Sequence, residues 1–185
     1  MKLKALLVAM IVSACAPAYG QKFSVSTNLL GYAALGTLNL DASYAVSRHW
    51  SISAGALYNP FTFHKGNPQK QFQLKQQSYY VGARLWLWHV WSGWWFASKM
   101  RYQEYNTGGI ISRQTTEGDR MGLGLYSGYT YMVSRHFNVE FGLGLWGGAD
   151  YYTKYSCPTC GFTMDKGVKG FLLPDDIMIS LAYVF

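Results

Sequence analysis

The sequence is poor in charged residues, which make up 14% of its 185 residues, whereas soluble domains carry about 25%. Nine residues are acidic and sixteen are Lys or Arg, which gives a mild basic excess. The basic residues are scattered along the chain and do not form one dense patch, which argues against a nucleic-acid-binding protein. We expect no nucleic-acid partner.

Long hydrophobic runs are also missing beyond the first twenty residues. The longest later apolar stretch, Leu85 to Ala97, is interrupted by His89, Ser92 and Gly93. A membrane-spanning helix needs about 20 apolar residues, so this stretch is too short. A membrane protein without spanning helices must be a closed β-barrel, because every backbone polar group has to be paired inside the bilayer.

Cysteine is scarce, with three residues in the chain. Cys157 and Cys160 have the spacing of thioredoxin-like redox sites. They lie in a segment rich in Gly, Tyr and Lys, without the helix start that stabilises a reactive thiolate. After export a local disulfide in an outer loop is expected. A zinc site needs two more ligands, and none lies close in the sequence, so we expect no metal and no cofactor.

The first residues read as an export signal. Lys2 and Lys4 precede an apolar run, residues 5–14, that is too short to cross a bilayer. Small residues before Gln21 predict Sec-type export with cleavage between Gly20 and Gln21. Residues 1–20 are then the signal peptide, and residues 21–185 form one domain. The alternative is a lipoprotein signal, in which Cys15 is lipidated and retained.

The rest of the sequence alternates apolar and polar residues with period two, and no segment holds a convincing helical stripe. In the first such segment Phe23 and Val25 share one face, while Ser24 and Ser26 share the other. Eight segments behave this way and are predicted to be strands: residues 23–29, 38–46, 50–58, 79–87, 94–103, 121–131, 137–145 and 177–185.

The connections between these strands alternate in length. Residues 47–49, 89–93 and 134–136 are tight turns, whereas residues 59–76, 106–118 and 147–175 are long; only the loop near residues 31–36 departs from the alternation. Bacterial barrels keep short turns on the periplasmic side and long loops outside. The predicted fold is therefore all-β: an eight-stranded antiparallel transmembrane up-and-down β-barrel with a plugged lumen, in the bacterial outer membrane.

One five-residue pattern occurs twice, as Val46 to Trp50 and as Val133 to Phe137. Both copies fall at a predicted periplasmic turn. We expect shared turn geometry, with an aromatic residue anchored at the membrane interface, in preference to a paired histidine site. Aromatic residues elsewhere predict two girdles: Trp50, Trp91, Trp94 and Tyr131 near the periplasmic interface, and Tyr58, Tyr79 and Tyr102 near the outer one.

The last strand ends with four apolar residues on one face, Ile179, Leu181, Tyr183 and Phe185. This ending resembles the signal that the barrel assembly machinery recognises on a final strand. We therefore expect that machinery as a partner, together with outer-membrane lipid and lipopolysaccharide.

Three groups of residues resemble a family of small Bacteroidota outer-membrane proteins that carries a domain-of-unknown-function label. They are Ser26 to Leu30, then Trp50 to Ile52 leading to Tyr58-Asn59-Pro60-Phe61, and Tyr155 to Gly161. The resemblance spans nearly the whole predicted mature chain. It implies a barrel, in some members linked to genes for surface fimbriae, and it brings no catalytic residues.

Five charged residues fall on the predicted inner face at a similar height: Asp41, Arg84, Lys99, Arg101 and Glu140. An eight-stranded barrel is only wide enough for its own side chains. We therefore expect a cross-lumen network of ion pairs that plugs the middle, because pairing lowers the cost of burying charge. A narrow ion path, or an acid–base pair from Asp41 and Glu140, is the alternative.

Three functions remain in competition. The favoured one is a structural or interaction protein that presents its three long loops to surface polymers, fimbrial components or lipopolysaccharide. Tyr151, Tyr152 and Tyr155 in the last loop are candidates for stacking on sugars. The second is a lipid-A-modifying enzyme, for which His64 and Ser78 are the nearest candidates; with no base and orienting partner, no activity is expected. The third is a small pore controlled by Arg84 or Glu140.

Overall fold

The computed structural model describes residues 21–33, 35–64, 71–109, 114–157 and 162–185, and most of them lie in strands. The elements are β1 (Phe23–Asn28), α2 (Leu29–Ala33), β2 (Leu38–Ala45), β3 (Trp50–Asn59), β4 (Thr62–Phe63), β5 (Phe72–Trp86), β6 (Gly93–Gly108), β7 (Thr115–Met132), β8 (Phe137–Tyr155) and β9 (Thr163–Val184). Among the described residues no helix has the length and hydrophobicity to cross a membrane.

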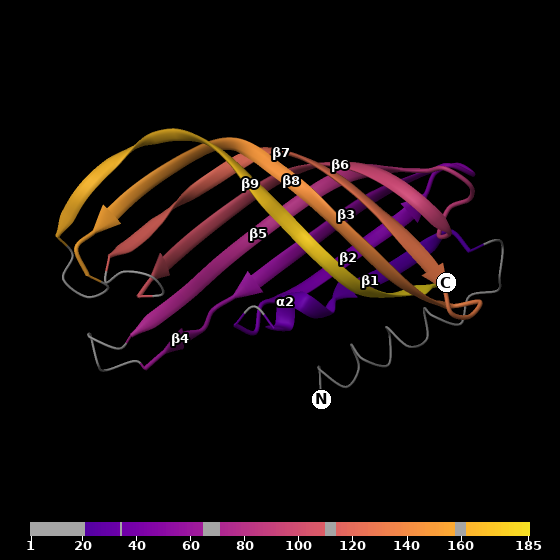
Figure 1. Ribbon diagram of the computed structural model, residues 1–185, viewed down its shortest axis with the longest axis horizontal. Coiled ribbons are helices and arrows are strands. Elements are labelled where there is room, and N and C mark those ends of the chain that lie inside the picture. The colour runs from indigo at the N-terminus through magenta and orange to yellow at the C-terminus, as the bar shows by residue number, and fades with distance from the viewer. Residues whose placement is uncertain (1–20, 34, 65–70, 110–113, 158–161) are drawn as a thin grey trace, which may run out of the picture.

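Eight of the strands close into a barrel (Figure 1). Each pairs antiparallel with its neighbour in the chain, β3 pairs with β5, and β9 returns to pair with β1. The two-residue β4 only extends the edge of β5. The prediction of an eight-stranded antiparallel up-and-down barrel is confirmed.

The strands differ greatly in length around the barrel. β1 to β3 have 6, 8 and 10 residues, whereas β6 to β9 have 16, 18, 19 and 22. In Figure 1 the long strands continue to the left, past the ends of the short ones. We call this continuation the outer extension and define it as residues 104–108, 115–120, 150–155 and 163–169.

The outer extension corrects the predicted loops. β7 begins at Thr115, β8 continues to Tyr155 and β9 begins at Thr163, so most of the predicted loop 147–175 is strand and the loop 106–118 is shorter. β5 likewise begins at Phe72, inside the predicted loop 59–76. The period-two signal fades there because outward side chains beyond the apolar part of the barrel have no reason to be apolar.

A second correction concerns the end of the first strand. Leu29 begins the helix α2, where it was predicted to continue the strand. The Asn28 Oδ1 atom accepts a hydrogen bond from the Leu30 backbone N–H at 3.1 Å. An Asn in this position caps a helix start, which stops the strand.

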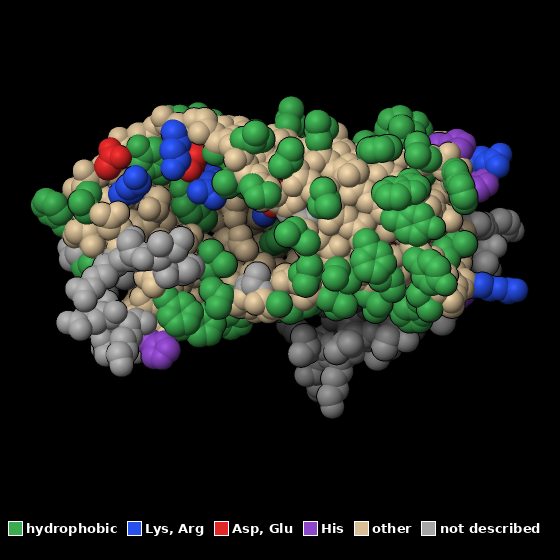
Figure 2. All heavy atoms as spheres, in the orientation of Figure 1, with side chains coloured by type: hydrophobic (Ala, Val, Ile, Leu, Met, Phe, Trp, Pro, Cys, Tyr) green, Lys and Arg blue, Asp and Glu red, His purple; other side chains and the backbone are tan. Residues whose placement is uncertain are grey.

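The two faces of the sheet are sharply different. On β6 the inward residues Trp95, Lys99 and Arg101 are buried, whereas outward Trp94 and Phe96 are more than half exposed. The same outward apolar face continues around the barrel and forms a belt toward the turn end (Figure 2). We call this the apolar belt; its exposed members include Leu40, Ile52, Val81, Met100, Leu123, Leu125, Phe141, Leu143 and Ile179.

The repeated five-residue pattern forms the same turn twice. The backbone N–H groups of Val46 and Ser47 both donate to the Trp50 carbonyl, and those of Val133 and Ser134 both donate to the Phe137 carbonyl. His49 bonds through Nδ1 to the Trp86 carbonyl at 3.1 Å, and His136 bonds in the same way to the Val184 carbonyl at 2.9 Å. The shared turn geometry is confirmed, and each histidine ties its turn to the adjacent strand.

Three tryptophans fill the lumen at the turn end. Trp86 and Trp95 are fully buried, and Trp91 is 5% exposed. Their indole N–H groups donate to Ser51 Oγ, Thr130 Oγ1 and the Gln21 carbonyl, at 2.9, 3.1 and 2.9 Å. Trp91 was predicted in the periplasmic aromatic girdle, which is wrong: its positive φ of 71° belongs to a tight turn that directs the indole into the barrel.

Candidate functional site

The lumen above the three tryptophans is lined by charged side chains that face one another across the barrel. Nearest the tryptophans, Arg84 Nη1 donates to both carboxylate oxygens of Glu140, at 3.1 and 2.9 Å. Both side chains are almost completely buried. The Arg84 guanidinium also lies 4.3 Å from the centre of the Trp95 ring, where a cation is attracted to the π face.

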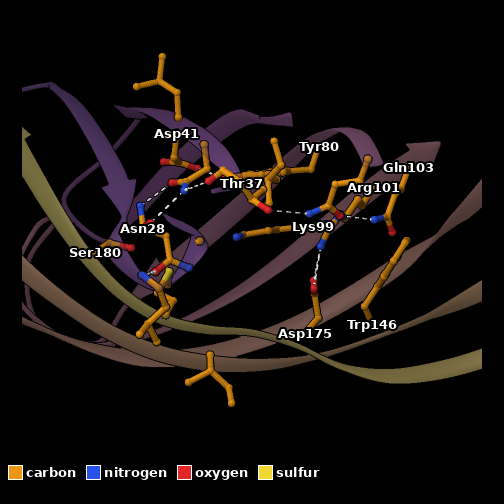
Figure 3. A pocket seen from close by; sticks show the side chains of 18 of the residues that line it. Asn28, Thr37, Asp41, Tyr80, Lys99, Arg101, Gln103, Trp146, Asp175 and Ser180 are labelled. Atoms are coloured by element: carbon orange, nitrogen blue, oxygen red, sulfur yellow. Dashed lines mark hydrogen bonds and ion pairs between the residues drawn. The ribbon is translucent and has the colours of Figure 1, made fainter. Parts of the chain in front are cut away.

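The next level contains Asp41 and Lys99. Asp41 accepts hydrogen bonds from the Tyr80 hydroxyl at 2.7 Å and the Ser43 hydroxyl at 2.9 Å. The Lys99 Nζ atom lies 4.4 Å from the ring centres of both Tyr80 and Tyr126. Tyr80 therefore connects the carboxylate and the ammonium group, as the close view in Figure 3 shows for Asp41, Tyr80 and Lys99.

Arg101 lies one level further out. Its Nη1 atom donates to both oxygens of Asp175 at 2.7 and 2.6 Å, and its Nε atom donates to Ser78 Oγ at 2.7 Å. The Tyr126 hydroxyl also donates to Asp175, at 2.8 Å. Because both partners carry charge, these hydrogen bonds are stronger than bonds between neutral groups.

The structure thus places all five predicted lumen residues inward, in three groups, and Tyr126 connects the outer two because it contacts Lys99 and donates to Asp175. Arg84 pairs with Glu140, Asp41 and Lys99 meet through Tyr80, and Arg101 pairs with Asp175, which the sequence reasoning missed. A β-bulge explains the omission. β9 contains three steps from Asp175 to Met178, opposite two steps from Gly144 to Gly142 on β8, so the alternation changes face there.

A further buried carboxylate was missed at the base of the outer extension. Asp150 is fully buried, accepts a hydrogen bond from the Tyr105 hydroxyl at 2.8 Å, and lies 3.2 Å from Arg120 Nε and 3.6 Å from Lys169 Nζ. Asp150 falls inside the segment predicted as a loop, where no inward face was assigned. Even-numbered residues of β8 face inward, so extending the predicted strand to residue 150 would have placed Asp150 inside the barrel.

A cavity of about 370 Å³ runs alongside these charged levels, from Arg84 to the outer rim (Figure 3). Its lining includes Asp41, Arg84, Lys99, Arg101, Gln103, Arg120 and Asp175, with the α2 residues Leu30 and Gly31 on one side. The filling of the lumen is therefore uneven, since tryptophans close the turn end and the cavity occupies the middle. The predicted plug through the whole lumen stays a prediction.

Asn28 and Asn39 line the rim of this cavity, and Asn59 lies nearby; Asn28 and Asn59 come from the sequence motifs. Asn39 Oδ1 accepts from the Asn28 backbone N–H at 2.5 Å, and Asn39 Nδ2 returns a hydrogen bond to the Asn28 carbonyl at 2.9 Å. Asn59 Nδ2 donates to Thr37 Oγ1 at 3.0 Å, while its Oδ1 accepts from the Phe61 N–H. These hydrogen bonds therefore hold together the short strands, the loop after α2 and the turn before β4.

The two residues considered for catalysis lie apart. Ser78 is fully buried in the lumen, where its hydroxyl bonds to Arg101 and to the Tyr102 carbonyl. The His64 ring packs against Phe72, 5.7 Å between centres. Ser78 lies six residue steps along β5 from Phe72, which is about 20 Å of strand. His64 and Ser78 thus form no nucleophile–base pair in this structure.

The remaining predicted residues are the two cysteines between β8 and β9 and the apolar end of β9. Cys157 is disulfide-bonded, and Cys160 lies outside the described residues. Tyr183 packs on Phe137 and on Phe185, with ring centres 5.0 and 4.7 Å apart, along the seam between β8, β9 and β1. Ile179, Leu181, Tyr183 and Phe185 all face outward. Their role as an assembly signal stays a prediction.

The described residues contain no group of three or more His, Cys, Asp or Glu side chains placed to hold a metal ion. No curated protein matches the chain. A family model described as "Protein of unknown function (DUF3575)" matches residues 5–185. That match covers nearly the whole chain, whereas the Bacteroidota origin and the fimbrial link stay predictions. The chain belongs to the family described as "Protein of unknown function (DUF3575)".

Proposed function

We propose that the protein is a bacterial outer-membrane barrel of structural or interaction type, which presents its outer extension to surface polymers, fimbrial components or lipopolysaccharide. The observation that carries this proposal is the length of β6 to β9, which have 16 to 22 residues. A membrane-crossing strand needs about 9–11 residues. If the apolar belt lies within the bilayer, the additional residues of β6 to β9 extend beyond the bilayer.

The dimensions of the apolar belt support a membrane position. On β7 the outward apolar face runs from Tyr131 to Met121, ten steps along the strand. Ten steps span about 33 Å, or about 25 Å along the bilayer normal at a tilt of about 40°. Just beyond it, Asp119 and Glu104 bring charge to the outward face. Soluble monomers rarely expose an apolar patch of this extent.

The outer extension is well suited to contact with polar partners. Its described charged residues carry both signs: Lys154, Lys166, Lys169 and Arg120 are basic, whereas Glu104, Glu117, Asp119, Asp150 and Asp165 are acidic. Tyr151 is 55% exposed on its outward face. Exposed tyrosines next to charged groups provide both stacking area and hydrogen bonds for saccharides.

The experiment compares the full chain with a shortened one. Tyr152 and Gly167 are partners across β8 and β9. Replacing residues 153–166 by Asn-Gly should close a two-residue hairpin there, and it removes residues 153–155 and 163–166, about half of the extension that the last two strands form. The replacement removes both Cys157 and Cys160, so neither cysteine of the predicted disulfide is left without the other. Heat-modifiable gel migration verifies that each protein still forms a barrel.

Binding is then measured to immobilised lipopolysaccharide, once with and once without its O-polysaccharide. The full chain should bind, and the shortened chain should bind at least tenfold more weakly. A difference confined to the form with O-polysaccharide would assign the contact to the polymer. Equal binding by the two chains, or no binding by the full chain, would overturn lipopolysaccharide as the partner of the extension.

A further inference from the structure

The turn end of the barrel carries a face with basic side chains only. Six exposed residues project there, namely Lys22, Arg48, His49, His89, Arg135 and His136. The segments that form this end, residues 21–23, 45–51, 87–93, 132–137 and 183–185, are all described and contain no Asp or Glu. Figure 2 shows Lys, Arg and His side chains projecting from the right-hand end. We call these six residues the turn face.

The excess of positive charge is specific to this end. In the outer extension four Lys and Arg residues stand against five Asp and Glu residues, so the signs nearly balance. Inside the lumen each arginine faces a carboxylate: Arg84 pairs with Glu140, Arg101 with Asp175 and Arg120 with Asp150. The turn face is therefore the part of the described protein surface that attracts anions.

The turn face adjoins the apolar belt through tryptophans. Trp50, Trp88 and Trp94 are 49%, 69% and 57% exposed, and all three lie in the turns or in the first residue or two of a strand beside them. Tryptophan favours the head-group level of a bilayer. Basic groups one or two residues beyond it fall at the depth of the lipid phosphates.

The turns hold these basic groups in defined positions. Arg48 Nε donates to His89 Nδ1 at 3.1 Å, and its Nη2 lies 3.0 Å from His89 Nε2. The His49 ring stacks on His89 with centres 6.3 Å apart. Because Arg48 and Arg135 occupy the same place in the repeated turn, the fold presents two equivalent arginines at this rim.

We infer that the turn face binds the phosphate head groups of anionic phospholipids in the leaflet at that side. This inference rests on the proposed membrane position. The three cations of the turn face, Lys22, Arg48 and Arg135, lie around the rim of the belt and contact several lipids at once, and each contact is electrostatic and short-ranged. The three cavities described above and at the outer end, by contrast, are not lined by any residue of the turn face.

The tryptophans themselves provide the readout. The other four, Trp86, Trp91, Trp95 and Trp146, are buried, so only the three at the turn end meet lipid. The full chain is refolded into phosphatidylcholine vesicles in which one fifth of the lipid is brominated, either as phosphatidylcholine or as phosphatidylglycerol. Quenching of tryptophan fluorescence reports which lipid lies beside the turn face.

The test variant is K22Q/R48Q/R135Q, and the matched control is K154Q/K166Q/K169Q, which removes the same charge from the outer extension. In the native chain brominated phosphatidylglycerol should associate about fivefold more strongly than brominated phosphatidylcholine, the factor that one cation near the surface contributes. The test variant should lose this preference, and the control should keep it. High salt should abolish it in the native chain.

Equal quenching by the two lipids in the native chain would overturn the inference, as would a preference that survives in the test variant or persists in high salt. An equal loss in both triple variants would also overturn it, because the effect would then follow net charge alone. If neither brominated lipid quenches the native chain, the membrane proposal itself fails. The native chain in low and high salt decides the matter even if the test variant does not refold.

Discussion

The two ends of this barrel are built differently. At the turn end two five-residue turns make the same hydrogen bonds, three buried tryptophans fill the lumen, and basic residues project from the rim. At the outer end the strands have unequal lengths, and the lumen below them holds a cavity that the charged side chains line. The comparison teaches that repeated turns and dense packing occur together at the end where the lumen is filled, whereas strands of irregular length occur at the opposite end.

The largest expected difference in stability between the two ends is at the buried Arg84–Glu140 ion pair next to the tryptophans. Arg84→Met leaves the Glu140 carboxylate buried without its main partner and should lower the free energy of unfolding by about 3–5 kcal/mol. Lys169→Met removes a half-exposed partner of Asp150 at the outer end and should cost less than about 1 kcal/mol. Urea titration in lipid vesicles, read by heat-modifiable migration, measures both.

The double variant R84M/E140M is the internal control for this prediction. It removes both charges and should recover stability to within about 1 kcal/mol of the native chain, because no lone charge remains. If Arg84→Met lowers the free energy of unfolding no more than Lys169→Met does, packing at the turn end does not contribute more to stability than packing at the outer end.

The second prediction compares the apolar belt with the outer extension. Leu125 is 71% exposed in the middle of the belt, and Val168 is 63% exposed on the outward face of the extension. Leu125→Arg should destabilise the barrel in vesicles by about 2–4 kcal/mol, and Val168→Arg by about 0–1 kcal/mol. Equal costs at the two positions, measured by the same titration, would place them in the same environment and remove the boundary between belt and extension.

The third prediction compares two glycines. A Cβ atom at Gly128 would lie 2.3 Å from the Trp95 ring and 2.2 Å from the Phe141 carbonyl oxygen, whereas at Gly167 it would meet nothing closer than the Tyr152 hydroxyl at 3.3 Å. Gly128→Ala should therefore cost about 1–3 kcal/mol through overpacking, and Gly167→Ala should be almost neutral. A neutral Gly128→Ala would show that the tryptophan packing is loose.

The smallest effect is expected at the tip of the outer extension. The Tyr155 hydroxyl donates to the Glu117 carboxylate at 2.5 Å, and this bond raises the pKa of Tyr155 above its ordinary value of 10.0 because it favours the protonated phenol. The stabilisation is present below the ordinary pKa and is lost as the pH rises through the raised one. Glu117→Gln should lower the pKa of Tyr155.

An alkaline NMR titration of labelled tyrosine checks this shift. Tyr152 serves as the reference, because its pKa is raised by a separate hydrogen bond to Asp165 and should not respond to Glu117→Gln. A Tyr155 resonance that titrates identically in both proteins would show that the hydrogen bond is not maintained in solution.

The sequence predicted the barrel, its strand order and its repeated turns, because alternation is strong wherever one face is apolar and the other is packed. Arg84 and Glu140 could be placed in one level by counting from the turns. Asp175 could not, since the bulge in β9 reverses the face without leaving a mark in the sequence pattern. Asp150 was not predicted because apolar and polar side chains no longer alternate in the strands beyond the apolar belt. The burial of Trp91 was not predicted because the residue type does not reveal the positive φ of this turn residue.

One labelling measurement tests the central claim that the apolar belt spans the outer membrane with the extension outside. Lys166→Cys lies on the exposed extension and Ser134→Cys on an exposed turn. In intact cells a membrane-impermeant maleimide should label the first and not the second, which should react only after the outer membrane is permeabilised; the native chain gives the background. Labelling of both or neither in intact cells, or of Ser134→Cys alone, would contradict the account.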